Sequence, residues 1–376
     1  MPQIVSVQAL SHGTGKSNLT ANLAMSIAQE GYRVGVIDTG IKPSGIHSLF
    51  GLDDDRTDQQ LNYYLWNDHL ADSDSHLVPL IRAGKGEVAV IGSDVYILPS
   101  EVKISDLTKQ LRQGFEPTRL SQSFSDLIRR LRLDYLFIDS RPEMDEEALF
   151  YKAIADVLLL VLNLDSQTLQ GIAVTVDIAR KLSVPNILLV ANQVLPGFEP
   201  NEVKQQLEHT YGEPVAGVLP FYDEMLQLAS SDLFCRRYPR HPLSQEIRAI
   251  AHSIMGLTPE VQPIVIDTVK PAAVKTTVTQ TDSSLSMFDV LALPNAQRQI
   301  VNWVLRNGSA TLKEIAAHMG EDEATLAPLV VALVDQGFIQ QSEEEGELRY
   351  QPHFFGRPTQ SSSDLWKIMS DDNSGS

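Results

Sequence analysis

A glycine-rich segment near the N-terminus, His12-Gly13-Thr14-Gly15-Lys16-Ser17, constrains the fold more than any other part of the chain. The strand-like run Ile4–Gln8 precedes it, and a helical pattern, Lys16–Glu30, follows it. A glycine loop between a strand and a helix is typical of a phosphate-binding loop, in which backbone amides close around phosphates at the positive end of the helix. Lysine neutralises the β and γ phosphates, and the serine hydroxyl binds Mg²⁺. The segment therefore predicts a site for a purine nucleoside triphosphate, namely ATP with Mg²⁺.

Further apolar runs alternate with helical patterns up to about residue 256. Several of these runs are apolar on both faces, as expected when helices cover both sides of a parallel sheet. This rhythm predicts a doubly wound, mostly parallel α/β domain of the P-loop NTPase class over residues 1–258. The expected strands are Ile4–Gln8, Arg33–Asp38, Val95–Leu98, Tyr135–Asp139, Val157–Asn163, Asn186–Asn192 and Val215–Leu219.

A second pattern follows a segment rich in Pro, Thr and Ser at 259–286, which we interpret as a linker. Three helices and then two strands are expected in about 70 residues, an arrangement typical of a winged helix. Residues 287–355 are therefore predicted to form a small α+β, winged-helix-like domain, and the tail 356–376 to be disordered. The expected elements are Pro294–Asn307, Thr311–Met319, Asp322–Gln336, Phe338–Gln341 and Glu347–Gln351.

The charge of the chain argues against a protein that coats nucleic acid. The net charge is -18, and residues 287–358 hold five basic against ten acidic side chains. Phosphate backbones require a basic face, so we expect the second domain to bind protein or to dimerise rather than to read DNA. One basic cluster, Arg236, Arg237 and Arg240, leaves non-specific DNA contact open.

The single cysteine, Cys235, excludes an internal disulfide and a cysteine-based zinc site. No signal peptide precedes the first strand, and the most apolar stretch, Ala153–Leu164, is too short to span a bilayer. The expectation is a cytoplasmic protein that does not bind membrane.

With Asn18–Ala24 after the loop and Val34–Asp38 further on, the chain resembles the ParA/MinD family of deviant-Walker P-loop ATPases. The runs Asp134–Ser140, Val190–Asn192 and Leu219–Pro220 also match, so the resemblance covers about residues 1–256. Members of this family are switches: two subunits sandwich ATP, recruit an adaptor or cargo, and separate after hydrolysis.

The resemblance also implies roles for individual residues. Asn192 would read the adenine edge, with Pro220 and Asp223 completing the base pocket. Asp38 stands where the first switch segment begins, and Asp139 would bind Mg²⁺ through water. The implied nucleotide-binding residues are Gly13, Thr14, Gly15, Lys16, Ser17, Asn18, Asn192, Pro220 and Asp223; the implied metal-binding residues are Ser17, Asp38 and Asp139; the implied catalytic residues are Lys16, Asp38 and Asp139.

Two departures from the family pattern bear on hydrolysis. Ser11 occupies the position of a signature lysine, and Gly40 that of an aspartate which orients the attacking water. Loss of such a group typically costs about 10²–10⁴ in rate, so we expect slow hydrolysis or none. Members that position carboxysomes similarly have serine in place of the signature lysine and use a lysine from a later helix.

Lys152 occupies the corresponding helix and is our candidate for a nucleotide contact; the alternative is a solvated or snorkelling lysine on an amphipathic helix. Arg141 stands where the family usually has proline. It would either contact the γ-phosphate or pair with a carboxylate such as Glu143 or Asp145.

Two functions follow from these features. The first is an ATP-dependent dimerising switch that positions or recruits a cargo. The second is a nucleotide-sensing regulator with little ATPase activity that acts through its winged helix. Ser11 and Gly40 favour the second, whereas Lys16, Ser17 and Asp139 permit the first.

Overall fold

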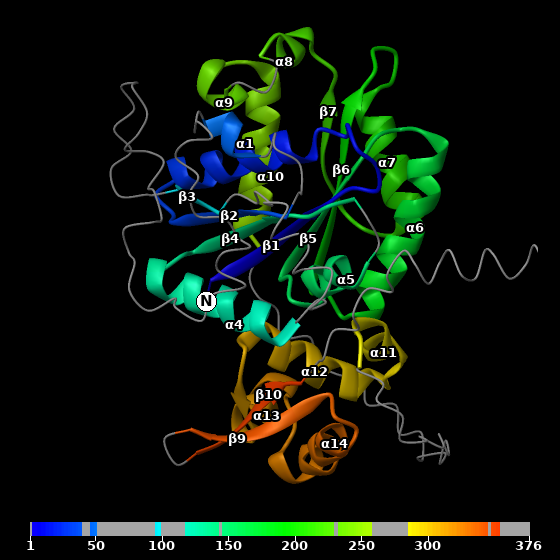
Figure 1. The fold of residues 1–376 in the computed structure, drawn as a ribbon. Helices are drawn as coiled ribbons and strands as arrows, with labels where there is room; N and C mark the ends of the chain where they lie inside the picture. The colour runs from blue at the N-terminus through cyan, green and yellow to red at the C-terminus, as the bar shows by residue number, and fades with distance from the viewer. Residues whose placement is uncertain are drawn as a thin grey trace, which may run out of the picture. The chain divides into compact units, whose positions relative to one another are not determined.

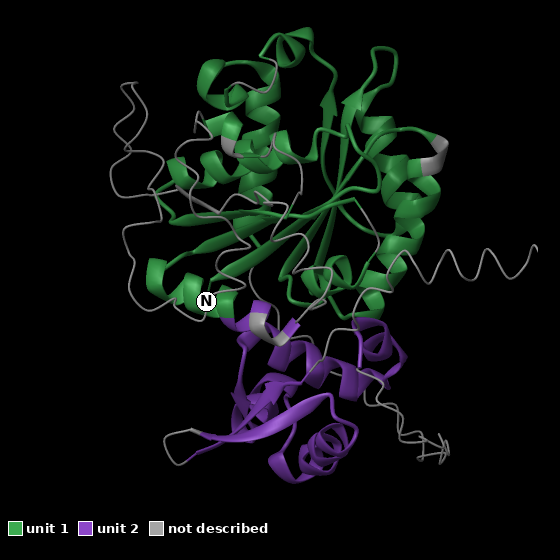
Figure 2. Ribbon diagram, in the orientation of Figure 1, with its two compact units in different colours: residues 1–102, 123–260 green, residues 103–122, 261–376 purple. Residues whose placement is uncertain are grey.

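The computed structural model describes residues 2–39, 46–50, 95–98, 117–142, 145–228, 232–257, 285–344 and 347–353. The chain divides into two compact units, one of residues 1–102 with 123–260, the other of residues 103–122 with 261–376 (Figure 2). Almost all of the expected linker and the whole tail lie outside the described residues, as do Gly40 and Glu143.

A parallel sheet of seven strands forms the centre of the first unit (Figure 1). Its order is β3-β2-β4-β1-β5-β6-β7, and every neighbouring pair is parallel, which confirms the predicted α/β fold. The strands are β1 (Gln3–Gln8), β2 (Val34–Asp38), β3 (Val95–Leu98), β4 (Tyr135–Asp139), β5 (Val157–Leu162), β6 (Asn186–Val194) and β7 (Val215–Pro220).

The central strands of this sheet are buried throughout, because helices cover both of its faces. Alternate residues of β1, such as Val5 and Val7, belong to the apolar core that α1 (Lys16–Gln29) and α10 (Pro242–Met255) share. The helix α5 (Glu146–Ala153) lies on the other face, where Gln8 Nε2 donates to the Ala148 carbonyl. The remaining elements are η1 (Ile46–Phe50), α4 (Pro117–Leu131), α6 (Ser166–Lys181), α7 (Pro200–Tyr211), α8 (Asp223–Gln227) and α9 (Phe234–Arg237).

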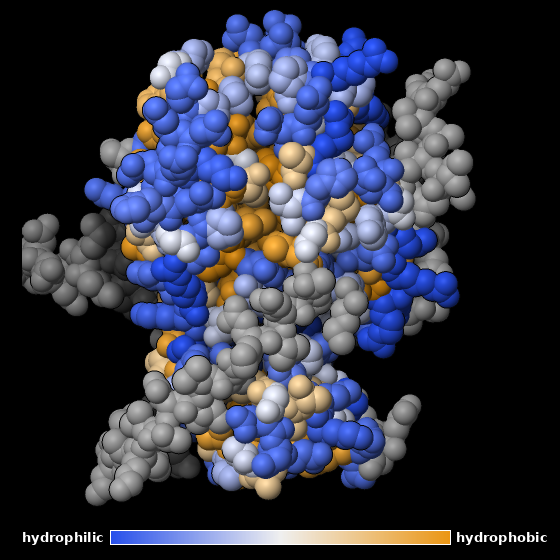
Figure 3. Space-filling model, turned by 180° about the vertical axis from the view of Figure 1, so that it is seen from behind, coloured by the Kyte–Doolittle hydropathy of each residue, from blue (hydrophilic) through white to orange (hydrophobic). Residues whose placement is uncertain are grey.

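Hydrophobic side chains are visible between hydrophilic ones on the rear surface of the first unit (Figure 3). The large apolar residues exposed in this unit include Leu195 and Phe198, after β6, and Leu226 in α8. Among the helices that the structure describes, none combines the length and apolarity needed to cross a membrane.

The second unit contains the three helices and the hairpin expected from the sequence. The Thr311 hydroxyl and the Glu314 carboxylate form a capping box that begins one helix, and the Asp322 carboxylate begins the next. Its small sheet is antiparallel, in the order β8-β10-β9. The elements are α11 (Met287–Ala292), α12 (Asn295–Asn307), β8 (Ala310–Thr311), α13 (Leu312–Met319), α14 (Glu323–Asp335), β9 (Ile339–Glu344) and β10 (Glu347–Pro352).

The expected strands and helices agree with the observed ones to within three residues at each end. The short elements η1, α8, α9, α11 and β8 were not predicted, because four to six residues carry too little periodicity to identify a helix and two too little for a strand.

Gly217 lets α10 approach β7 closely. A β-carbon at this position would lie 2.6 Å from Cδ1 and 2.7 Å from Cγ1 of Ile250, which is fully buried. We expect Gly217→Ala to lower the free energy of unfolding by about 1–3 kcal/mol, because overpacking forces the neighbour to move. Urea denaturation measures the change. Gly256→Ala is the matched control, since a β-carbon there would lie 3.4 Å from its nearest neighbour, the His252 carbonyl oxygen. An equal loss of stability in both variants would contradict this account.

Candidate functional site

The phosphate loop joins β1 to α1 at the carboxyl edge of the sheet. Gly13 and Gly15 have φ angles of +81° and +78°, a conformation that favours glycine. Gly15 is the N-terminal cap of α1 and gives the helix no side-chain cap. The first amides of α1 therefore remain available to an anion, at the positive end of the helix dipole.

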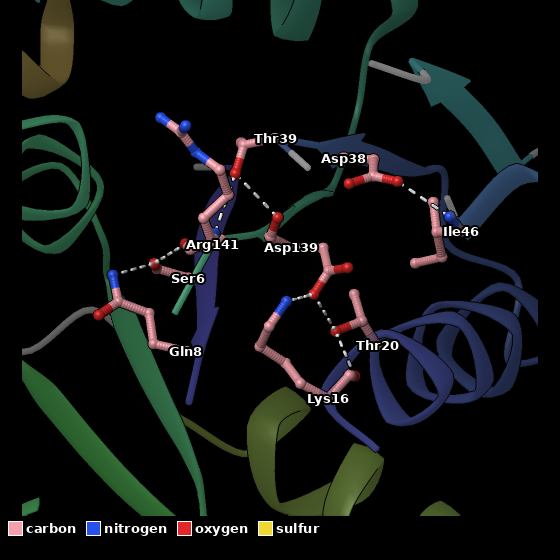
Figure 4. A network of polar contacts seen from close by, with 10 residues as sticks. Ser6, Gln8, Lys16, Thr20, Asp38, Thr39, Ile46, Asp139 and Arg141 are labelled. Carbon is pink, nitrogen blue, oxygen red and sulfur yellow. Dashed lines mark hydrogen bonds and ion pairs between the residues drawn. The ribbon is translucent and has the colours of Figure 1, made fainter. Parts of the chain in front are cut away.

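Lys16 and Asp139 form a direct ion pair at this edge (Figure 4). The side chain of Asp139 is 2% exposed and that of Lys16 is 11% exposed. Thr20 Oγ1 also lies 3.5 Å from Asp139 Oδ1 and donates to the Lys16 carbonyl at 3.0 Å. The strand β4 and the helix α1, more than a hundred residues apart in sequence, thus bring together two of the predicted catalytic residues.

Asp38 lies beside Asp139 in register, at the ends of the paired strands β2 and β4. Its Oδ2 accepts a hydrogen bond of 2.9 Å from the amide of Ile46, so the carboxylate holds the start of η1. Ser17 is partly exposed in the first turn of α1. Asn18 Oδ1 accepts from Asn22 Nδ2 at 2.9 Å, which engages the Asn18 side chain within the helix.

The oxygen donors of this edge fit the chemistry of Mg²⁺. Within the described residues, no three His, Cys, Asp or Glu side chains cluster as metal ligands. Mg²⁺ normally keeps several waters and binds one or two carboxylates together with substrate phosphates. Ser17, Asp38 and Asp139 carry the hydroxyl and carboxylate oxygens that a metal held in this way would use.

Thr39 connects the ends of β2 and β4, a role that sequence reasoning missed. Its hydroxyl donates to the Asp139 carbonyl at 3.1 Å and accepts from the Arg141 amide at 3.1 Å (Figure 4). Its own amide also donates to the Asp139 carbonyl, at 3.2 Å. One buried side chain therefore fixes the backbone on both sides of Ser140.

Asn192 and Gln193 of β6 reach the phosphate loop from the side. Asn192 Nδ2 donates to the Thr14 carbonyl at 2.7 Å, and Gln193 Nε2 donates to the Gly13 carbonyl at 3.1 Å. These bonds leave Asn192 Oδ1 as the atom that would accept from an adenine amino group. Pro220 pairs in register with Val194 on the adjacent strand, and Asp223 begins α8 just beyond it.

Arg141 pairs with carboxylates, as one of the two alternatives predicted. Its guanidinium lies 3.5 Å from Asp145 Oδ2 and also pairs with Glu147, which the sequence analysis did not name. The hydroxyl of Tyr151 donates to the same Glu147 carboxylate. Burial raises the pKa of Glu147, although the charge of Arg141 opposes this effect. In Figure 4 the Arg141 side chain points away from Lys16.

Lys152 is buried in α5, with 1% of the residue exposed. Its Nζ donates to the Ala148 carbonyl, 3.3 Å away. Burial lowers the pKa of Lys152 to about 8, and the charge of Asp145 opposes this shift. The alternative of a solvated lysine is therefore wrong, because the ammonium group lies within the fold.

Other residues singled out by the sequence differ in their surroundings. Ser11 is exposed on the loop. Arg236, Arg237 and Arg240 are all exposed, and Arg236 pairs with Asp232. Cys235 is 2% exposed and belongs to the apolar core, where burial raises the pKa of its thiol.

This arrangement agrees with what the chain is similar to. The family described as the CobQ/CobB/MinD/ParA nucleotide binding domain matches residues 5–233, which is more than half of the chain. The chain belongs to this family. Its first unit is accordingly a nucleotide-binding domain of the MinD/ParA type.

The curated relatives of this MinD/ParA-type chain have different stated roles. An uncharacterized ATP-binding protein of Methanocaldococcus jannaschii is 25% identical over 252 residues, 66% of this chain and 86% of that protein. The cytosolic Fe-S cluster assembly factor CFD1 of Chaetomium globosum is 31% identical over 157 residues. That match spans 42% of this chain and 46% of the fungal protein, so the chain covers less than half of that relative.

Solved structures agree with the fold of the first unit. MinD in the MinC:MinD cell division protein complex of Aquifex aeolicus has a TM-score of 0.54 at 17% identity, over 68% of this chain and 96% of that one. MinD of Pyrococcus horikoshii, complexed with Mg-ADP, has a TM-score of 0.53 at 20% identity, over 68% and 96% of the two chains.

Three of the residues that shape this edge carried no recognisable sequence signal. Thr39 and Gln193 act through contacts between segments that a linear pattern does not relate, whereas Glu147 contacts Arg141 and Tyr151, six and four positions away. Only the position of Gln193, next to Asn192, could have drawn attention to it.

We expect Thr39→Val to lower the free energy of unfolding by about 1–3 kcal/mol, because it leaves the buried Arg141 amide and Asp139 carbonyl with fewer partners. Nucleotide binding should also need more Mg²⁺, since the backbone that carries Asp139 loses its anchor. Chemical denaturation and a Mg²⁺ titration of ADP binding measure the two effects. Thr39→Ser keeps the hydroxyl and should retain the Mg²⁺ requirement of the wild type; an identical shift in both variants would refute the role of the hydroxyl.

Because Lys152 is buried, the free energy of unfolding should change with pH in a defined direction. Between the folded-state pKa of about 8 and the ordinary value of 10.5, the unfolded chain holds a proton that the folded chain has lost. Stability should therefore rise with pH through this window. Lys152→Met removes the titration and should be as stable as the wild type or up to about 3 kcal/mol more stable at pH 7.

Urea denaturation of both proteins between pH 7 and pH 10.5 tests the Lys152 prediction. The free energy of unfolding of the wild type should increase relative to that of the methionine variant as pH rises. A constant difference would mean that Lys152 titrates at its ordinary value.

Proposed function

We propose that this chain is an ATP-dependent switch that forms a homodimer with ATP, hydrolyses it slowly, and recruits an adaptor or cargo protein. The observation that carries the proposal is the ion pair of Lys16 with Asp139 beside the uncapped first turn of α1. These are the groups that a nucleotide phosphate and its metal would engage.

Different residues would bind the phosphates, the base and the metal. The amides of Gly13, Thr14, Gly15 and Asn18, together with Lys16, would hold the phosphates, and Asn192, Pro220 and Asp223 would surround the base. Mg²⁺ held by Ser17, Asp38 and Asp139 would neutralise charge on the transferred phosphoryl group. Because Lys16 neutralises Asp139 in this structure, it must exchange that carboxylate for phosphate when nucleotide binds.

Slow hydrolysis follows from the residues at the two departing positions. Serine at position 11 supplies no charge, and glycine at position 40 supplies no acceptor to orient water. Lys152 is the candidate for the missing charge. Burial in α5 lowers the pKa of Lys152 because the charged ammonium group loses its hydration. A contact with the nucleotide phosphates would offset this loss.

A homodimer is supported by the apolar residues beyond the strand ends. Leu195, Phe198 and Leu226 are exposed in the segments that follow β6 and β7. Carboxyl ends of parallel strands share one edge, so these residues lie at the same edge as the phosphate loop. Exposed apolar side chains of this size are suited to a partner surface.

The second unit supports a role in recruitment. Its helices and its hairpin follow the order of a winged helix, which we infer to be its fold. Acidic residues gather at the start of α14 and in the hairpin, so a protein partner suits it better than DNA. Non-specific DNA contact by the first unit would depend mainly on Arg237 and Arg240, because Arg236 pairs with Asp232.

A nucleotide-sensing regulator with little ATPase activity is the second candidate, favoured by Ser11 and Gly40. A role in Fe-S cluster assembly, as named for the fungal relative, has less support in the side chains of this chain. Iron–sulfur clusters are held by cysteine thiolates, usually four. This chain has one cysteine, and it is buried in the apolar core.

The test measures ATP turnover and oligomeric state with ATP, ADP and a non-hydrolysable analogue, with and without non-specific DNA. We expect a dimer with ATP and with the analogue, a monomer with ADP, and slow turnover. Lys16→Ala should abolish nucleotide binding and dimerisation and is the control. A tight ATP complex that remains monomeric and shows no turnover would favour the regulator; no binding of any adenine nucleotide would overturn both.

A further inference from the structure

Gln193 has an unusual backbone conformation for a residue within a strand. Its φ angle is +56°, in the left-handed region that L residues other than glycine seldom adopt. Among the described residues, Arg132 and Ser183 share this conformation, but each follows the end of a helix, where it is common. At Gln193 no helix end explains the strain, and strained residues of this kind concentrate at functional sites.

The strain allows two successive side chains to reach the same target. Side chains alternate between the two faces of a regular strand, so neighbours cannot both point one way. Asn192 and Gln193 nevertheless both donate to the phosphate loop. The register of β6 against β7 shifts between Ala191 and Val194, and a bulge of this type re-aims a side chain.

Both polar atoms of the Gln193 side-chain amide form hydrogen bonds. Its Oε1 accepts from Asn163 Nδ2 at 3.1 Å, while its Nε2 donates to the Gly13 carbonyl at 3.1 Å. The three residues Asn163, Asn192 and Gln193 thus form an amide clamp between the ends of β5 and β6 and the loop. Gly15 accommodates the clamp, because a β-carbon there would lie 2.5 Å from Asn192 Nδ2.

The clamp holds two carbonyls of the loop, and it thereby orients two of the loop's N–H groups. In a planar trans peptide, the C=O of one residue and the N–H of the next point in opposite directions. No cis peptide occurs in the described residues. Holding the Gly13 and Thr14 carbonyls toward β6 therefore turns the N–H groups of Thr14 and Gly15 away from β6.

We propose that the amide clamp preorganises the phosphate loop, and that Gln193 is a positioning residue for nucleotide binding. The inference rests on the proposed binding of nucleotide phosphates by this loop. Strain at Gln193 is offset by a loop whose donors are oriented before the ligand arrives, which reduces the ordering that binding must impose. The essential feature is a donor at position 193 directed at the Gly13 carbonyl.

The experiment compares ADP and ATP affinities, by calorimetry with Mg²⁺, for the full chain, three variants at position 193 and one control variant. Gln193→Gly removes the donor and relieves the strain, and Gln193→Glu keeps the acceptor for Asn163 but cannot donate. Both should bind about fivefold to tenfold more weakly, the cost of one lost hydrogen bond. Gln193→Lys supplies a new donor and should stay within about twofold of the wild type.

Ser183→Gly is the matched control, because Ser183 has the same φ angle of +56° and follows α6. Both glycine variants should be as stable as the wild type or more so, since glycine adopts this conformation freely. Of these two glycine variants, only Gln193→Gly should lose affinity. Equal losses in the two variants, or wild-type affinity in both Gln193→Gly and Gln193→Glu, would overturn the inference.

Hydrogen exchange without nucleotide separates this inference from the proposed function. Amides in a peptide spanning residues 9–18 should exchange about fivefold faster in Gln193→Gly than in the wild type or in Ser183→Gly. Unchanged exchange would overturn the clamp even if nucleotide binds. Faster exchange in a chain that binds no nucleotide would support the clamp and refute the proposed function.

Discussion

The ion pair between Lys16 and Asp139 is the interaction on which the arrangement of this edge depends. A carboxylate with 2% exposure is costly to bury without a compensating charge, and Lys16 provides it. The pair fixes the first turn of α1 against the end of β4. Thr20 lies beside the Asp139 carboxylate from the helix, and Thr39, just after β2, donates to the Asp139 backbone carbonyl, so that three segments of the chain meet at one residue.

Much of this fold could be predicted because its signals are local. The apolar strands, the glycine loop and the helix boundaries are each encoded within a few neighbouring residues, and so the sheet, the second unit and the positions of Lys16 and Asp139 followed. Thr39 and Gln193 could not be predicted in the same way. One acts on a residue a hundred positions later, and the other depends on a bulge that no residue pattern specifies.

The helix α5 shows how burial changes the meaning of a charged residue. The sequence leaves Lys152 either as a nucleotide contact or as a solvated or snorkelling lysine. The structure buries it, while Glu147 on the same helix accepts from both Arg141 and Tyr151. Charges placed in such surroundings cost stability, and shifted pKa values of this kind are found more often at functional sites than elsewhere. This helix thus holds two groups whose protonation depends on their neighbours.

The central place of β1 has a consequence for synthesis of the chain. β1 is made first, but its partners β4 and β5 begin at residues 135 and 157. At about 5–20 residues per second, β1 waits roughly 6–25 s after leaving the ribosome before β4 exists. During this interval an apolar strand has both edges unpaired, which exposes a nascent chain of this topology to aggregation.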